Sequence, residues 1–74
     1  MIKGTVLMVK GDKLLLVANH KYYISKGKGD VGDQKEFDET TSLLMPSYMF
    51  AIAAMEEENL DETLNFIQNE WFKK

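Results

Sequence analysis

Two apolar runs close to the start of the chain place the tightest limits on its fold. The runs Ile2 to Val9 and Leu14 to Asn19 are rich in β-branched and aliphatic residues, and Lys10-Gly11-Asp12-Lys13 separates them. Such residues favour strands, and a Gly-Asp pair suits a two-residue hairpin loop that needs positive φ. The sequence therefore predicts an antiparallel hairpin here.

A third strand is predicted at Tyr22 to Ser25, because Asn19-His20 supplies a second turn. Asparagine tolerates the left-handed conformation better than other non-glycine residues. The stretch Lys26 to Asp33 contains three Gly, two Lys and two Asp, which predicts a solvated loop. A short fourth strand is then expected around Gln34 to Asp38, with Phe37 as its inward-facing anchor.

The predicted hairpin is apolar on both of its faces. Side chains alternate along a strand, which puts Val6 and Met8 opposite Leu7 and Val9 in the first strand, and Leu14 and Leu16 opposite Leu15 and Val17 in the second. A sheet with two apolar faces must curl on itself or be covered.

The stretch from Leu43 to Phe72 favours helix, because it has no glycine, only Pro46, and many Ala, Met, Leu, Glu and Gln residues. A C-terminal helix is indicated by an apolar stripe, in which Leu60, Leu64, Ile67 and Trp71 recur at i, i+4, i+7 and i+11. Asn59 is placed to cap this helix, with Asp61 and Glu62 in its first turn.

The residues before that helix allow two arrangements. Helix propensity predicts a first helix over Tyr48 to Met55, which would form a helix hairpin broken near Asn59. However, Glu56, Glu57 and Glu58 would then lie at the negative C-terminal end of that helix. The alternative is a strand through Tyr48 to Ala53 that leads into one longer helix starting near Glu56. The helix hairpin is favoured slightly.

The size and composition fit one small domain. The chain has 74 residues, of which 45% are apolar, and no cysteine, so neither disulfides nor an oxidising compartment is indicated. No apolar run reaches the length of a membrane helix, and no export signal is expected.

We expect a cytoplasmic α+β protein: a small antiparallel β-meander or an OB- or SH3-like barrel of three to five strands, followed by one or two C-terminal helices. Residues 1–40 would form the β-rich part and 43–73 the mainly helical part.

Catalytic, metal and cofactor motifs are not expected to be functional here. His20 is the single histidine, and its position in a turn favours an exposed side chain over a catalytic base. Gly27 to Gly32 matches G-x-G-x-x-G, but no helix is predicted after it. The loop acids miss calcium-loop spacing; they are Asp30, Asp33, Glu36, Asp38 and Glu39. The sequence therefore predicts no enzyme activity, no cofactor and no metal site.

The charge is divided unevenly along the chain. Residues 1–35 hold seven Lys and three Asp, whereas residues 36–74 hold two Lys and nine acids. One interpretation is that Lys solvates the strands and Glu the helices; the other is that the acidic half recruits a partner protein. The candidate partner-binding residues are Glu56, Glu57, Glu58, Asp61, Glu62 and Phe72. Phe72 is an anchor if it is exposed, whereas Trp71 and Phe72 would instead cover the core if they fold back.

The favoured function is therefore a small non-enzymatic protein-binding module, such as an adaptor, an inhibitor or a chaperone-like accessory protein, whose partner is not identified. The alternative is a small barrel that binds single-stranded nucleic acid through bases interleaved with aromatic rings. Its candidate residues are Lys21, Tyr22, Tyr23, Lys26 and Lys28. The absence of arginine argues against that alternative. Assembly into a homo-oligomer is a third expectation.

Several short motifs resemble one known family. They are Gly4-Thr5-Val6, Val9-Lys10-Gly11-Asp12, Val31-Gly32-Asp33, Phe50-Ala51-Ile52, Met55-Glu56-Glu57-Glu58 and Glu62-Thr63-Leu64. In this order they resemble the HypC/HupF hydrogenase maturation chaperones, in which a small OB-like barrel is followed by an acidic helix. The resemblance implies a strand at Phe50-Ala51-Ile52. The family's signature cysteine after the initiator Met is absent, with Ile2 in its place, so the metal-delivery function is not expected here.

Overall fold

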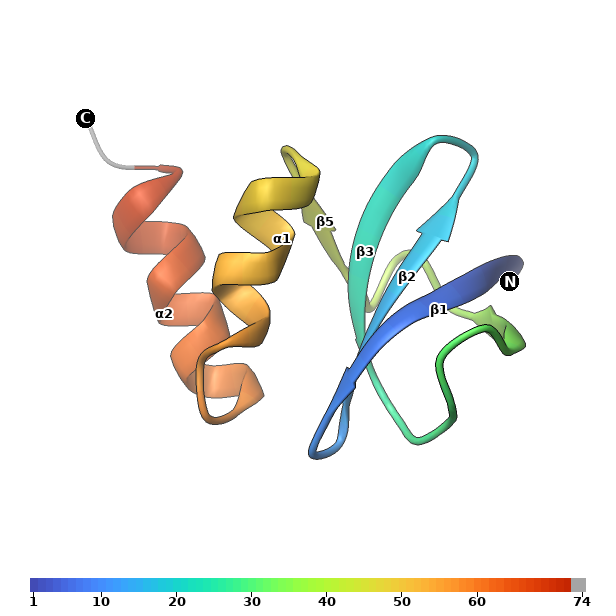
Figure 1. The fold of residues 1–74 in the computed structure, drawn as a ribbon. Helices are drawn as coiled ribbons and strands as arrows, with labels where there is room; N and C mark the ends of the chain where they lie inside the picture. The colour runs from blue at the N-terminus through green and yellow to red at the C-terminus, as the bar shows by residue number, and fades with distance from the viewer. Residues whose placement is uncertain (73–74) are drawn as a thin grey trace.

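The computed structural model describes residues 1–72 and consists of a five-stranded antiparallel sheet followed by two helices (Figure 1). The strands run in the order β4-β1-β2-β3-β5 across the sheet. Their bounds are β1 Ile2–Lys10, β2 Lys13–Ala18, β3 Lys21–Lys26, β4 Gln34–Phe37 and β5 Leu43–Met45. The predicted small α+β fold is therefore confirmed.

Both predicted hairpin turns are present. Gly11 has φ of 61° between β1 and β2, where Lys10 pairs with Lys13. Asn19 and His20 have φ of 53° and 65° between β2 and β3. Positive φ at both central residues, as at Asn19-His20, or at the first central residue alone, as at Gly11-Asp12, matches the right-handed twist of the flanking strands, so each turn was readable from local residue chemistry.

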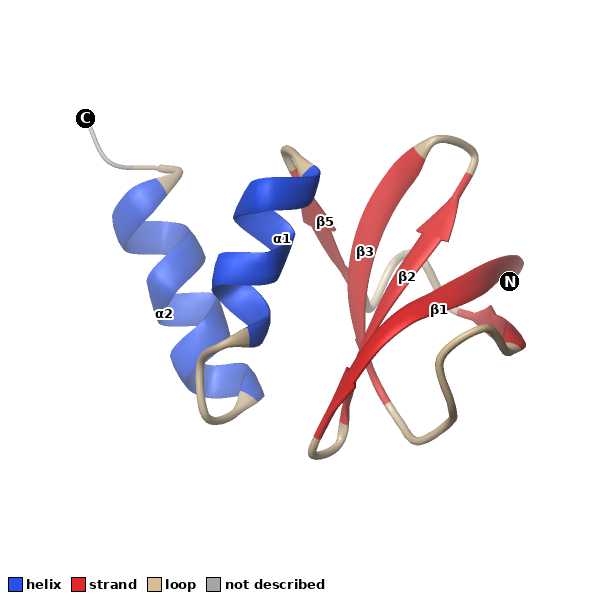
Figure 2. Ribbon diagram, viewed as in Figure 1, coloured by secondary structure: helices blue, strands red, loops and turns tan. Residues whose placement is uncertain are grey.

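The C-terminal part is a helix hairpin, made of α1 Tyr48–Met55 and α2 Leu60–Glu70. Helix α1 packs against the sheet and α2 packs against α1 (Figure 2), while residues of α2 also reach β3 and β5, with which they line two cavities. Ser47 and Asn59 cap the two helices by accepting hydrogen bonds from the N–H groups of Phe50 and Glu62. The strand through Tyr48 to Ala53 is therefore wrong, and so is the strand that the family resemblance implied at Phe50-Ala51-Ile52.

Three residues that were expected to favour helix form a strand instead. Leu43–Met45 is β5 and pairs with Tyr22, Tyr23 and Ile24 of β3. Leucine and methionine have good helix propensity, but pairing with β3 and burial of Met45 override it. The helical part was also predicted to reach residue 73, which lies outside the described residues.

A β-bulge in β1 corrects the predicted assignment of side chains to faces. Val6 pairs with Leu16 and Met8 pairs with Leu15, so Leu7 is an extra residue in the ladder. As a result Leu7 and Met8 both contact the helix side of the sheet, while Val6 and Val9 lie in the other cluster. The prediction that Val6 and Met8 share a face is wrong for this reason.

Each face of the sheet has its own core. The first lies between sheet and helices and contains Leu15, Ile24, Met45, Ala51, Ala54, Met55 and Ile67. The second lies on the opposite face and contains Val6, Leu14, Leu16, Ala18, Tyr23 and Phe37. The rings of Tyr23 and Phe37 lie 5.1 Å apart in this second core, which confirms Phe37 as the inward-facing anchor of β4.

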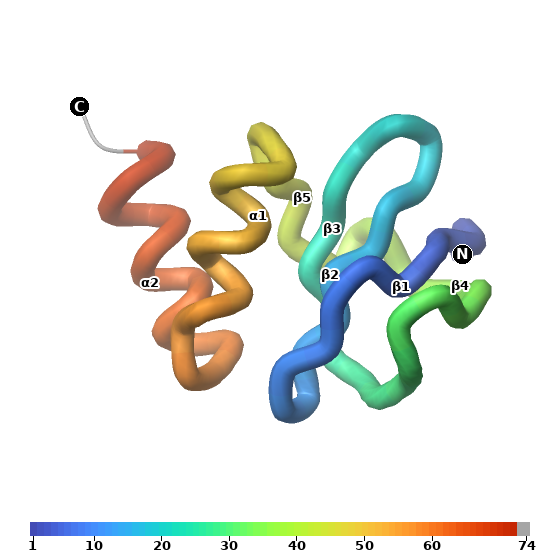
Figure 3. The backbone as a smooth tube through the Cα atoms, in the orientation of Figure 1, coloured from blue at the N-terminus to red at the C-terminus, as the bar shows by residue number. Residues whose placement is uncertain are grey.

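The second core is enclosed because the sheet curls. Strands β4 and β5 are consecutive in the chain, yet they lie at opposite edges and only residues 38–42 connect them (Figure 3). The edges of a flat five-stranded sheet lie about 19 Å apart. The connection is compact, since the Asp38 carbonyl accepts hydrogen bonds from the Thr41 N–H and the Ser42 hydroxyl. So short a link requires the two edges to approach each other.

Two lysines of the first hairpin bind the end of α1. Lys13 is fully buried, and its Nζ donates to the carbonyls of Ala54 and Glu57 at 3.3 and 2.6 Å. The Nζ of Lys10 donates to the Glu56 carbonyl at 3.0 Å and lies 3.5 Å from the Glu56 carboxylate. Cations are stabilising at a helix C-terminus. The positive charges of these two lysines therefore compensate for the unfavourable interaction of Glu56, Glu57 and Glu58 with the negative end of a helix that ends at Met55.

Candidate functional site

A set of large apolar side chains stays exposed where β5 lies beside α2. The exposed fractions are 43% for Leu44, 40% for Leu64, 40% for Trp71 and 63% for Phe72. Single exposed apolar residues are common on proteins, but a contiguous group of them marks an interaction surface. This group is the strongest candidate for a functional site in the described residues.

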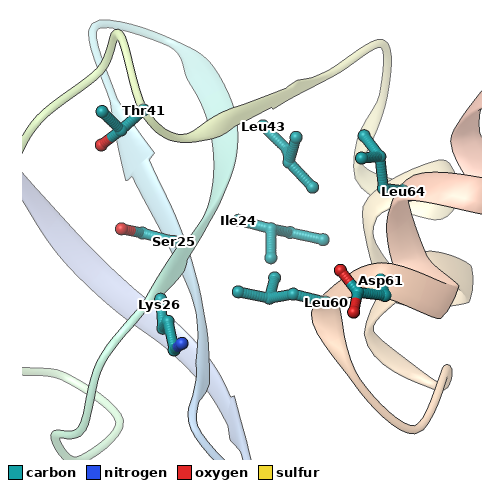
Figure 4. A pocket seen from close by; sticks show the side chains of 8 residues that line it. All are labelled: Ile24, Ser25, Lys26, Thr41, Leu43, Leu60, Asp61 and Leu64. Carbon is teal, nitrogen blue, oxygen red and sulfur yellow. The ribbon is translucent and has the colours of Figure 1, made fainter.

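A cavity of about 380 Å³ opens at one end of this surface. Ile24 and Leu43 from the sheet face Leu60 and Leu64 from α2 across it (Figure 4). Its polar rim is formed by Ser25, Lys26, Thr41 and Asp61. An apolar interior with a few polar groups at the rim is suited to receiving an apolar side chain.

A second cavity, of about 230 Å³, continues toward the C-terminus. Its lining residues are Ser42, Leu43, Leu44, Leu64, Ile67, Trp71 and Phe72. Because Leu43 and Leu44 point to opposite faces of the sheet, a cavity that contacts both lies beside the edge of β5. The two cavities share Leu43 and Leu64, so they are adjacent, and we call them together the edge groove.

The backbone of β5 is also open to a partner. Strand β5 is the last in the sheet and pairs only with β3. Successive N–H and C=O groups of a strand point alternately to its two sides. Among residues 1–72, no backbone group outside β3 pairs with the outward-pointing groups of β5. The edge groove therefore combines apolar walls with unpaired backbone donors and acceptors.

The predicted apolar stripe of α2 is only partly buried, which explains how the groove arises. Ile67 is buried and Leu60 is half-buried, whereas Leu64 and Trp71 remain exposed. The side of α2 that faces the core also carries Thr63, which is buried, and Phe66, which is half-buried and packs against the first core. Helix α2 is thus rotated relative to the expectation, and one flank of its stripe faces the edge of β5.

The predicted partner-binding acids do not form one cluster. Asp61 lies at the rim of the edge groove, and Phe72 lies at its other end. Glu57 and Glu62 line a separate, shallow depression on another flank of α2, beside Phe66. Glu56 is paired with Lys10, and Glu58 is exposed in the turn between the helices. The structure therefore brings only Asp61 and Phe72 to the groove.

Trp71 and Phe72, which follow α2, are more exposed than they would be if they folded back over the core. Trp71 packs on Phe50 with ring centroids 6.2 Å apart, and Phe72 stacks on Trp71 at 5.0 Å. Neither residue is buried. Phe72 therefore meets the condition set for a partner anchor, namely that its ring is exposed.

The residues of the nucleic-acid alternative are arranged differently from a stacking platform. Tyr23 is buried in the second core, and Tyr22 is half-buried with its ring 5.4 Å from that of Tyr48. Lys21, Lys26 and Lys28 are exposed. The lysines thus remain available to phosphate, but no exposed ring from this pair accompanies them.

The remaining chemical candidates occupy turns and loops. His20 is exposed in the turn between β2 and β3, and the G-x-G-x-x-G stretch leads into strand β4 without an intervening helix. No group of three or more His, Cys, Asp or Glu side chains suited to a metal ion occurs within residues 1–72. In the same part of the chain, neither helix has the length and apolarity needed to cross a bilayer.

Sequence reasoning missed three residues that define the groove: Leu43, Leu44 and Leu64. Leu64 was expected to be core because it fits the helical stripe. Leu43 and Leu44 were assigned to a helical segment because β5 is too short to show an alternating pattern. The one local signal was the pair of leucines directly after the Thr41-Ser42 turn.

Comparisons with known proteins give this chain no relative. No family model matches it, and neither a curated protein nor a solved structure shows significant similarity to it.

Proposed function

We propose that this chain is a non-enzymatic protein-binding module of the cytoplasm that docks a partner protein in the edge groove. The observation that carries the proposal is the meeting of Leu44, Leu64, Trp71 and Phe72 beside an unpaired strand edge. Burial of apolar surface drives most protein association.

Two further properties support this function. Aromatic residues are enriched among the side chains that carry most of the binding energy at interfaces, and Trp71 and Phe72 form a stacked pair at one end of the groove. Residues 43–72 hold six acids and no Lys or Arg, and such a net negative charge favours association with a basic partner.

The proposal is tested by affinity purification of the tagged protein from its native cells, with and without nuclease, followed by mass spectrometry. The wild type is compared with Leu64→Glu and Phe72→Glu in the groove, and with Met49→Glu as a matched control. Met49 is 81% exposed at the start of α1 and is not among the residues that line the groove.

We expect one stoichiometric protein partner that survives nuclease, is lost with the two groove variants and is retained with Met49→Glu. Material that disappears on nuclease treatment would instead support the nucleic-acid alternative, which depends on Lys21, Lys26 and Lys28. Equal recovery of the partner by all variants would overturn the groove as the docking site.

A further inference from the structure

We propose that the helix hairpin, residues 46–72, is a cover that opens as one unit while the five strands stay folded, and that Lys10 and Lys13 hold it closed. Opening makes an apolar face of the sheet and a row of lysines accessible. This inference concerns a motion of the protein and does not rest on the protein-binding function proposed above.

The second core holds the strands together without the helices. All of its buried residues belong to β1, β2, β3 and β4, and the half-buried Ile2 and Val9 that pack against it belong to β1. The backbone pairing of the sheet likewise joins strands only to one another. Three or more strands with a covered apolar face can be stable without a helix. Departure of the helices therefore leaves the second core and its strand pairing intact.

Only two residues of the sheet hold the helix hairpin by hydrogen bonds. Within the described residues, every hydrogen bond between the first 45 residues and the helix hairpin is donated by Lys10 or Lys13. The acceptors lie at the junction of α1 and α2: Ala54, Glu56, Glu57 and Thr63. The covalent link lies at the opposite end of α1, where Pro46 and Ser47 follow β5. The hairpin can therefore swing away once the two lysines release its junction.

These lysines belong to a row of three on the helix-facing side of the sheet. Lys10 pairs with Lys13 across β1 and β2, and Lys13 pairs with Lys26 across β2 and β3. Residues that pair directly have side chains on the same face, and like charges in such pairs are destabilising. Acids of the helix hairpin lie beside the row: Glu56 is paired with Lys10, and Asp61 lines two cavities together with Lys26. The closed form therefore reduces repulsion within the lysine row.

The packing between the helices and the sheet is incomplete. Cavities of about 380 and 230 Å³ lie where α2 meets β3 and β5, and Leu64 stays 40% exposed beside them. Side chains that line a cavity lose van der Waals contacts that close packing provides. Regions with few buried apolar contacts open at a lower free energy than the rest of a protein. The helix hairpin is therefore the part of this fold that opens first.

Opening changes what the sheet presents to its surroundings. Leu15, Ile24 and Met45 are buried against the helices in the closed form and become accessible. Lys13 and Leu15 lie two residues apart in β2, so they share a face, and the lysine row borders the apolar residues. The helix hairpin thus controls access to a face that combines apolar side chains with cations.

The test is native-state hydrogen exchange of the full chain, followed residue by residue by NMR at increasing urea concentration. We expect the amides of α1 and α2 to exchange through one shared opening, about tenfold or more faster than the slowest amides of β1, β2 and β3, relative to the intrinsic rate of each amide. This opening should depend less on urea than strand exchange does, because it exposes less surface. A single opening with one urea dependence for helices and strands would overturn the inference.

One conservative change in each core separates a cover from a single cooperative unit. Phe37→Leu weakens the second core, which is present in both the closed and the open form. It should accelerate strand exchange about 3–10-fold and leave helix exchange within about twofold of the wild type. Ile67→Val weakens the first core, which exists only in the closed form, and should accelerate both sets of amides about 2–10-fold. Equal acceleration of helices and strands by Phe37→Leu would show that the molecule opens only as a whole.

The role of the lysines is tested in the same experiment with Lys13→Met. We expect helix exchange about tenfold faster than in the wild type, because the junction of the helices loses its buried donor. Lys21→Met is the matched control, since Lys21 is exposed in β3 and lies outside the lysine row; it should leave helix exchange unchanged. Equal helix exchange in the two variants would overturn Lys13 as the group that holds the cover closed.

Discussion

The Nζ of Lys13 donates a hydrogen bond of 2.7 Å to the hydroxyl of Thr63, and neither side chain has any exposed surface. Thr63 in turn contacts the carbonyls of Ala54 and Asn59 at 3.2 and 2.9 Å. A buried cation is costly unless its donors find acceptors. Here the acceptors are supplied by the junction of the two helices, so the first hairpin and the helix hairpin are joined through one ammonium group.

Replacing Lys13 by Met should lower the free energy of unfolding by about 1–3 kcal/mol. Methionine has a similar length but donates no hydrogen bond, and the Glu57 carbonyl would lose the donor that lies 2.6 Å away. Urea denaturation measures the change. The control is Lys21→Met at an exposed position, where we expect a change within about 0.5 kcal/mol. Equal stability of the two variants would show that the buried amine contributes nothing net.

Thr63→Val should also destabilise the protein, by about 1–2 kcal/mol, because valine fills the same space without the hydroxyl. The two changes should not be additive. In a double-mutant cycle with Lys13→Met, we expect a coupling energy of about 0.5–3 kcal/mol, the range found for residues in one hydrogen-bond network. A coupling energy of zero would mean that the 2.7 Å contact is energetically silent.

The stability of the wild type relative to Lys13→Met should rise with pH. Burial lowers the pKa of Lys13 from its usual 10.5 and Lys10 lowers that pKa further, against the opposing effect of Glu57, Asp12 and Glu62. Between the folded-state pKa and 10.5 the unfolded chain binds more protons at this site than the folded one, so raising the pH favours folding. Urea midpoints of both proteins, followed from neutral pH toward 10.5, check this. A constant or shrinking difference contradicts it.

Gly4→Ala should destabilise the sheet by about 1–3 kcal/mol. A Cβ atom at Gly4 would lie 2.8 Å from Cε1 of Phe37 and 3.0 Å from the Val17 carbonyl oxygen, which is closer than van der Waals contact. In a Phe37→Leu background the ring is gone, and the cost of Gly4→Ala should fall. Denaturation of the four proteins in this cycle measures the effect. An undiminished cost would assign the clash to the Val17 carbonyl instead.

Charge reversal should distinguish the two flanks of α2. Asp61→Lys changes the rim of the edge groove, whereas Glu62→Lys changes the other flank. Both residues lie in the first turn of the helix, so the loss of favourable interaction with the helix dipole is matched. We expect Asp61→Lys to weaken binding of the recovered partner about 3–10-fold, measured by titration calorimetry, and Glu62→Lys to weaken it less. The reverse order would move the binding site to the depression beside Phe66.

Turns and caps were predictable because their chemistry is local. Gly11, Asn19 and Asn59 each act on the backbone within a few residues, so neighbouring sequence is sufficient to recognise them. The slight preference for a helix hairpin also proved right. The doubt about it came from Glu56 and its acidic neighbours, and the lysines that resolve that doubt lie more than 40 residues away.

The features that could not be predicted from the sequence depend on contacts between residues that are far apart in the chain. Strand β5 is extended because it pairs with β3, not because of the intrinsic propensity of its own leucines. The edge groove could therefore not be predicted from the sequence. Lys13 was placed in the connection between the first two strands, and nothing near it in the sequence indicates its burial. The bulge at Leu7 shifts half a strand by one residue, a change that periodicity alone does not detect.

The hydrogen bond between Lys13 and Thr63 spans 50 residues, and this separation has a consequence during synthesis. At ~5–20 residues per second the ribosome needs about 3–10 s to make the intervening chain, whereas a hairpin forms in about 1–10 μs. Whenever the β1–β2 hairpin forms in the nascent chain, the helix-facing side of Leu15 is therefore uncovered until the helices are made. During that time the ammonium group of Lys13 places a charge on this apolar side, and an inward-pointing charge opposes pairing with other nascent chains.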